Sequence, residues 1–134
     1  MLSESIILHM YKVEIENRGD YRFDVRSKDY QFVVDTNGKG ITPPDTLLAS
    51  LGSCVGVYIR KYFESAKIAV PHFKVFVEGD LGKEAPYLFR AISVKIDMEG
   101  APLDERRKTA LLNFIKNCPI HNTLKANPAV EISI

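Results

Sequence analysis

The chain has 134 residues, of which 46% are hydrophobic and 26% charged, and its 18 basic and 17 acidic side chains leave a formal net charge of +1. This length is enough for one folded domain and too short for two ordinary ones, so we expect a single domain over residues 1–134. The balanced charge gives no reason to expect nucleic acid, and the absence of a signal-peptide pattern or a long apolar run predicts a cytoplasmic protein with no membrane partner.

The N-terminal part of the chain alternates apolar and polar residues in three short segments separated by turn-forming residues. Residues 7–16 end in clean alternation, the Asn-Arg-Gly-Asp sequence at 17–20 is typical of a hairpin turn, and residues 21–26 and 30–35 alternate again. This pattern predicts three antiparallel strands. A loop at 36–40 then leads to the next element.

Residues 42–66 form the longest segment with a helical period, and they include the first cysteine. Apolar residues recur there at spacings of three and four, which on a helix makes one broad apolar face. They are Leu47, Leu48, Leu51, Val55, Tyr58, Ile59, Tyr62 and Phe63. Thr42 is placed to cap this helix, and Asp45 lies near the positive end of its dipole.

Small residues surround Cys54 in the middle of this helix. Glycine inside a helix costs roughly 1 kcal/mol relative to alanine, so Gly52 and Gly56 predict a neighbour packed closely beside the thiol. The helix is also nearly apolar all round at this turn. Because one sheet in a small domain covers only one side of a helix, we expect the other side to meet a second subunit.

The C-terminal half alternates strand and helix patterns. Residues 69–78 and 88–98 read as two more strands, residues 102–116 as an amphipathic helix, residues 120–125 as a short helix and residues 130–134 as a last strand. Clustered strands with separate helices predict an α+β fold with a largely antiparallel sheet.

The two cysteines, Cys54 and Cys118, are too few for a disulfide framework or a four-cysteine zinc site. Cys118 precedes a proline at the expected start of the short helix, where unpaired N–H groups stabilise a thiolate; the alternative is a small residue at a helix break. Cys54, taken alone, is more typical of a core cysteine. With His121 they would supply at most three metal ligands, so no metal site and no cofactor are expected.

Two segments, residues 44–62 around the first cysteine and 117–124 around the second, resemble the signature sequences of the OsmC/Ohr superfamily. The order of elements matches that family as well. The resemblance implies an intertwined α+β homodimer with two active sites at the subunit interface. It also implies reduction of alkyl and fatty-acid hydroperoxides, with Cys54 as the peroxidatic thiolate and Cys118 as the resolving thiol.

The sequence departs from the hydroperoxide-reductase branches at the groups that assist the thiol. Those branches place a glutamate ten positions before the first cysteine, where this chain has Pro44 followed by Asp45. They also carry an activating arginine near the first hairpin, where this chain has Arg18, Arg22 and Arg26. We expect Arg22 to be the pocket cation and Asp45 to orient it. The patterns at the two cysteines are more like those of the less characterised OsmC-like branch.

The expected function is therefore a thiol-dependent peroxidase of oxidative stress defence. The Cys54 thiolate attacks an organic hydroperoxide, the sulfenic acid condenses with Cys118, and a dithiol of the lipoyl or thioredoxin type restores the pair. The alternative is a small-molecule-binding module whose cysteines only line an apolar interface pocket. A working peroxidatic cysteine would be distinguished by reactivity well below the usual thiol pKa of about 8.5.

Overall fold

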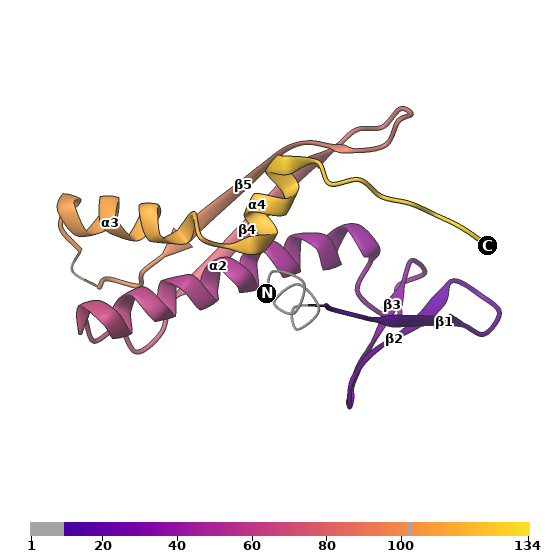
Figure 1. The fold of residues 1–134 in the computed structure, drawn as a ribbon, viewed down its shortest axis with the longest axis horizontal. Coiled ribbons are helices and arrows are strands. Elements are labelled where there is room, and N and C mark those ends of the chain that lie inside the picture. Colours follow the sequence, from indigo (N-terminus) through magenta and orange to yellow (C-terminus); the bar gives the residue numbers. More distant parts are fainter. Residues whose placement is uncertain (1–9, 102) are drawn as a thin grey trace, which may run out of the picture. The chain divides into compact units, whose positions relative to one another are not determined.

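The computed structural model describes residues 10–101 and 103–134. The chain divides into two compact units, residues 1–46 and 47–134, and we describe each by itself (Figure 1). The expectation of a single domain stays a prediction. Residues 7–9 of the expected first strand and residue 102 of the expected amphipathic helix lie outside the described residues.

The N-terminal unit contains an antiparallel sheet in the order β1-β2-β3. Its strands are β1 (Glu14–Asn17), β2 (Arg22–Ser27) and β3 (Tyr30–Asp35). This sheet confirms the predicted meander, although among the described residues the pairing of β1 with β2 covers Glu14–Asn17, one residue beyond the predicted end of the first strand. The register places apolar residues on one face and charged residues on the other. The apolar face carries Ile15, Phe23, Val25, Phe32 and Val34.

A capped helix follows the sheet, as the sequence predicts. Helix α2 (Pro43–Ala66) begins where the Asp45 N–H donates a hydrogen bond to Thr42 Oγ1 at 3.3 Å. The Thr42 hydroxyl in turn donates to Asp45 Oδ2 at 2.8 Å, so each side chain satisfies a polar group of the other. The start of α2 is therefore fixed by local interactions.

In the C-terminal unit, α2 packs against the antiparallel pair β4 (Lys74–Leu81) and β5 (Phe89–Asp97). The core side chains of α2 are Leu51, Val55, Ile59 and Phe63. A methyl group added at Gly52 would lie 2.8 Å from Val77 Cγ2, so β4 crosses α2 directly at this glycine. The close neighbour predicted beside the thiol is thus a strand of the same chain.

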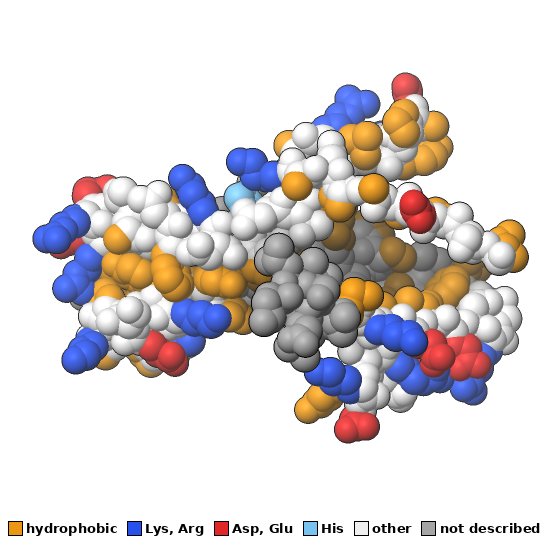
Figure 2. All heavy atoms as spheres, viewed as in Figure 1, with side chains coloured by type: hydrophobic (Ala, Val, Ile, Leu, Met, Phe, Trp, Pro, Cys, Tyr) orange, Lys and Arg blue, Asp and Glu red, His pale blue; other side chains and the backbone are white. Residues whose placement is uncertain are grey.

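Two shorter helices complete the C-terminal unit. Helix α3 (Glu105–Ile115) begins at Asp104, whose side chain accepts a hydrogen bond from the Arg107 N–H, and α4 (Pro119–Ala126) begins at Cys118. The ring of Phe114 of α3 packs at a tilt against the rings of Tyr58 and Tyr62 of α2. Hydrophobic side chains accordingly gather along the seam between α3 and α2 (Figure 2).

The predicted strand at residues 130–134 is wrong. Asn127 takes a left-handed conformation after α4, and the residues beyond it form no strand. Val130 and Ile132 are 78% and 93% exposed, so the alternation there faces no sheet within the described chain. A strand needs a hydrogen-bonding partner as well as a pattern. The other elements confirm the α+β class with antiparallel sheets.

Across residues 10–101 and 103–134, no helix has the combined length and apolar character needed to cross a membrane.

Candidate active site

The structure brings the two cysteines together. Cys54 lies in the middle of α2 and is half-buried, whereas Cys118 is fully buried, with 0% of its surface exposed. Cys54 packs against the core cluster that includes Cys118, and the Cys118 side chain acts directly on the pKa of the Cys54 thiol. Residues that are far apart in the sequence therefore place two free thiols close to each other.

The backbone at the start of α4 acts on both sulfur atoms. The His121 N–H donates to Cys118 Sγ at 3.4 Å, and the backbone of Ile120 lowers the pKa of the Cys54 thiol. The helix begins here because Pro119 occupies its first turn, where the missing N–H costs nothing. Unpaired N–H groups at a helix N-terminus stabilise negative charge, so this end of α4 suits thiolate chemistry.

Burial raises the pKa of the Cys54 thiol above its ordinary value, and the neighbouring Cys118 thiol raises that pKa further. The Ile120 N–H and the positive charge of Lys61 act in the opposite direction and lower the pKa, but the net direction is upward. The C-terminal unit therefore holds Cys54 mainly as a neutral thiol. A peroxidatic role requires a further cation near the sulfur atom.

Aromatic residues and a lysine continue the α2 surface beyond Cys54. The centres of the Tyr58 and Phe114 rings are 5.9 Å apart, and Lys61 Nζ lies 4.9 Å from the centre of the Tyr58 ring. The sequence analysis did not single out Lys61. Its spacing would have indicated it, because positions 54, 58 and 61 follow one another along one side of a helix.

Arg22, the predicted pocket cation, lies on β2 in the N-terminal unit with 57% of its side chain exposed. Within the described residues its ion pair is with Asp24, at 3.3 Å. Arg18 and Arg26 both pair with Glu16, at 3.4 and 2.9 Å. Arg22 is thus less engaged than Arg26, which also pairs with a second glutamate. Its role at the thiol stays a prediction.

Asp45, the predicted orienting acid, serves as a capping partner of Thr42 in the first turn of α2. Positions 45 and 54 are nine residues apart, which on a regular helix means opposite sides and about 13 Å along the axis. The local structure thus accounts for Asp45 through capping. Its role in orienting a cation stays a prediction.

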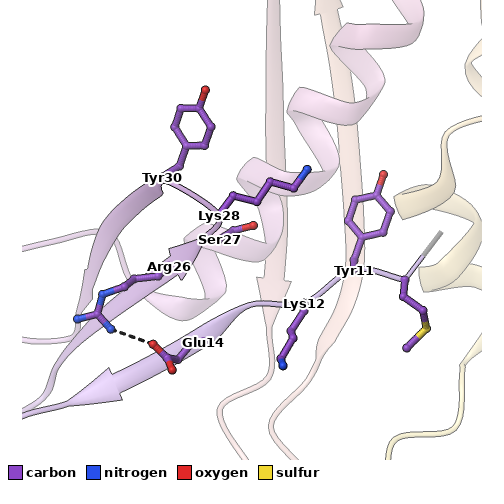
Figure 3. Close-up of a pocket in the computed structure, with 8 residues that line it drawn as sticks. Tyr11, Lys12, Glu14, Arg26, Ser27, Lys28 and Tyr30 are labelled. Atoms are coloured by element: carbon purple, nitrogen blue, oxygen red, sulfur yellow. Dashed lines mark hydrogen bonds and ion pairs between the residues drawn. The ribbon is translucent and has the colours of Figure 1, made fainter. Parts of the chain in front are cut away.

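A separate hollow of about 800 Å³ lies in the N-terminal unit, between the segment before β1 and the turn from β2 to β3 (Figure 3). It is lined by Met10, Tyr11, Lys12, Glu14, Arg26, Ser27, Lys28 and Tyr30. Neither cysteine lines it. Among the described residues, no group of three or more His, Cys, Asp or Glu side chains could hold a metal ion.

A free thiol in the middle of α2 and a second one at the start of α4, among helices packed with antiparallel strands, define a dithiol protein of the α+β class. The sequence matches the family of OsmC-like proteins over residues 36–133, and the chain belongs to that family. This match confirms the resemblance seen in the two cysteine segments. No curated protein sequence is significantly similar to the chain.

Solved structures share the fold at low sequence identity. An OsmC-like protein from Mycoplasma pneumoniae is 21% identical, with a TM-score of 0.76 and coverage of 87% of each chain. An organic hydroperoxide resistance protein from Legionella pneumophila is 19% identical, with a TM-score of 0.62 over 88% of this chain and 92% of that one. The corresponding protein from Elizabethkingia anophelis is 18% identical, with a TM-score of 0.61 over 88% and 91%. These similarities confirm the OsmC-like α+β fold.

Proposed function

We propose that the chain is a thiol-dependent peroxidase that reduces organic hydroperoxides through Cys54 and Cys118. The observation that carries this proposal is the packing of both thiols in one core cluster, because a disulfide forms only between neighbouring sulfur atoms. The Legionella and Elizabethkingia proteins of the same fold are organic hydroperoxide resistance proteins, which supports a role in oxidative stress defence.

The reaction begins at Cys54, which is more exposed than Cys118. The Cys54 thiolate attacks the terminal peroxide oxygen, the O–O bond breaks, and the alkoxide takes up a proton and leaves as the alcohol. Cys54 is then a sulfenic acid. The Cys118 sulfur attacks it, water leaves, and a disulfide joins the two residues. The protein has thereby supplied the two electrons that reduced the peroxide.

A dithiol of the lipoyl or thioredoxin type then restores the two thiols by thiol–disulfide exchange and is itself oxidised to a disulfide. The aromatic side chains of Tyr58, Tyr62 and Phe114, which lie beyond Cys54 on α2 and across from it on α3, favour a substrate with an alkyl group. Each buried CH₂ contributes about 0.8 kcal/mol to such binding. Organic hydroperoxides are therefore preferred over hydrogen peroxide.

The raised pKa of Cys54 requires a cation in addition to Lys61. We assign this role to Arg22, oriented by Asp45, in a homodimer whose interface carries the two sites. A second subunit is supported by apolar residues left in water on the chain alone, such as Val57 of α2, which is 51% exposed. An intertwined interface of this kind buries more than roughly 2,000 Å².

Two variants test the redox roles. Cys54→Ser should abolish even the first turnover with an organic hydroperoxide. Cys118→Ser should release about one equivalent of alcohol per site and then stop, with a sulfenic acid on Cys54 that a dimedone-type probe labels. Mass spectrometry after one equivalent of hydroperoxide locates the label. A label on Cys118 in the Cys54→Ser variant would reverse the two roles.

A second candidate function, an apolar small-molecule-binding module, is favoured by one observation, the raised pKa of the Cys54 thiol. In that case the cysteines only line the pocket. Equimolar hydroperoxide would then oxidise neither variant, and alkylation of Cys54 would require a pH above the ordinary thiol pKa.

A further inference from the structure

We infer that Lys61 is a second cation of the thiol site, held by Tyr58 in a position where its ammonium group stabilises the Cys54 thiolate. The link from this thiolate to peroxide reduction rests on the proposed function. The electrostatic role of Lys61 toward Cys54 can be tested without any peroxide.

The geometry of α2 aligns the three residues. Cys54, Tyr58 and Lys61 follow one another at spacings of four and three, so they lie along one side of the helix. Helical side chains lean toward the helix N-terminus, which directs the long lysine chain back toward the cysteine. Lys61 Nζ lies 4.9 Å from the centre of the Tyr58 ring, which places the charge about one turn beyond Cys54.

The tyrosine ring is itself held in place. Tyr58 packs against the hydrophobic core, and its ring lies 5.9 Å from that of Phe114 on α3. Phe114 also contacts Tyr62 at a ring distance of 6.1 Å. The face of a tyrosine ring attracts a cation, so a fixed ring restricts where the ammonium group of Lys61 resides.

The charge on Lys61 is not neutralised by a neighbouring acid. Across residues 10–101 and 103–134, no Asp or Glu forms an ion pair with Lys61, whereas Lys74 pairs with Glu99 and Lys108 pairs with Glu105. No ion pair within the described residues therefore offsets the positive charge of the ammonium group. In agreement, the charge of Lys61 lowers the pKa of Cys54, against the larger effect of burial.

The other groups that face Cys54 carry no fixed positive charge. They are the Cys118 thiol and the Ile120 N–H at the start of α4, with His121 in the same turn. Lys61 is exposed, so its effect on Cys54 is subject to screening by salt, whereas hydrogen bonds and burial are screened much less. Salt dependence is thus a property that a purely structural role of Lys61 would not produce.

The test uses the full chain with Cys118→Ser, so that Cys54 is its only thiol. The thiol pKa is taken from the rate of alkylation by iodoacetamide as a function of pH. Lys61→Gln should raise this pKa by about half a unit at low salt. At a pH below the pKa, this shift lowers the alkylation rate about threefold. Lys61→Arg should retain most of the wild-type value. In 1 M salt the difference between Lys61→Gln and wild type should vanish.

Lys95→Gln is the matched control, because it removes the same charge from an exposed position on β5. It should leave the thiol pKa unchanged. The inference is overturned if Lys61→Gln and Lys95→Gln give the same pKa, or if Lys61→Arg behaves like Lys61→Gln. If the wild-type chain consumes no hydroperoxide while the Lys61 shift is found, the proposed function fails and the role of Lys61 stands.

Discussion

The crossing of β4 over α2 at Gly52 can be tested with a single methyl group. In Gly52→Ala the new Cβ would lie 2.8 Å from Val77 Cγ2, which is closer than carbon atoms pack. Val77 is β-branched and lies in a paired strand, so it has little freedom to move away. Overpacking costs about 1–3 kcal/mol, and replacing a helical glycine by alanine returns about 1 kcal/mol. We expect the free energy of unfolding to fall by about 1 kcal/mol in urea denaturation.

Gly56→Ala is the control, one turn further along the same helix. Its new Cβ would meet only Phe73 Cε1 at 3.9 Å, an ordinary van der Waals distance. Only the gain in helix propensity remains, so we expect Gly56→Ala to raise the free energy of unfolding by about 0.5–1 kcal/mol. The same substitution should thus have opposite signs at the two glycines. Equal stability changes, or a more stable Gly52→Ala, would refute the close crossing of β4.

Three further predictions concern the thiols, the assembly and a helix cap. After the protein is oxidised with diamide, an added monothiol should form a mixed disulfide with Cys54 and not with Cys118, because Cys118 is fully buried. Peptide mass spectrometry that shows a Cys118 adduct would contradict this prediction. Sedimentation at micromolar concentration should show a dimer, and a monodisperse monomer would exclude the proposed interface. Asp104→Ala should lower the free energy of unfolding by about 1 kcal/mol, since the side chain accepts the Arg107 N–H at 2.8 Å, while Asp104→Asn should lower it less.

Local signals predict α2 almost to the residue. The sequence predicts a helix over 42–66, and the structure has it over Pro43–Ala66. A threonine cap, prolines in the first turn and an apolar period all act within a few residues of one another, so no distant contact is needed to interpret them. Gly52 also carries local information, because its cost in helix propensity indicates a close neighbour without identifying it. The same reasoning is wrong at Gly56, where a new Cβ would meet only Phe73 Cε1 at 3.9 Å.

Features that depend on distant parts of the chain are not visible in such patterns. Residues 130–134 alternate like a strand, but a strand forms only where another segment offers hydrogen bonds. The raised pKa of Cys54 likewise results from burial and from Cys118, neither of which is encoded in the residues next to it. Lys61 is an intermediate case, since its spacing from Cys54 is local but the ring that holds it is fixed by α3.

The choice of Arg22 as the activating cation gives a prediction whose sign follows from the pKa of Cys54. Without that cation, burial and the neighbouring Cys118 thiol control the protonation of Cys54, so Arg22→Ala should have a Cys54 pKa above that of an ordinary thiol. At a pH below the pKa, the thiolate fraction falls tenfold for each unit by which the pKa rises. The rate of hydroperoxide reduction at pH 7 should therefore fall about tenfold for each unit by which the pKa of Cys54 rises. The pH–rate profile should move to higher pH.

Arg26→Ala provides the control for this prediction. Its guanidinium is engaged with Glu14 at 3.1 Å and Glu16 at 2.9 Å, so it is already committed to the charged face of the N-terminal sheet. Removing it should leave both the thiol pKa and the pH–rate profile in place. If Arg26→Ala shifts the pH–rate profile and Arg22→Ala does not, the assignment of Arg22 is wrong. The ion pairs within the sheet would then not determine which arginine activates the thiol.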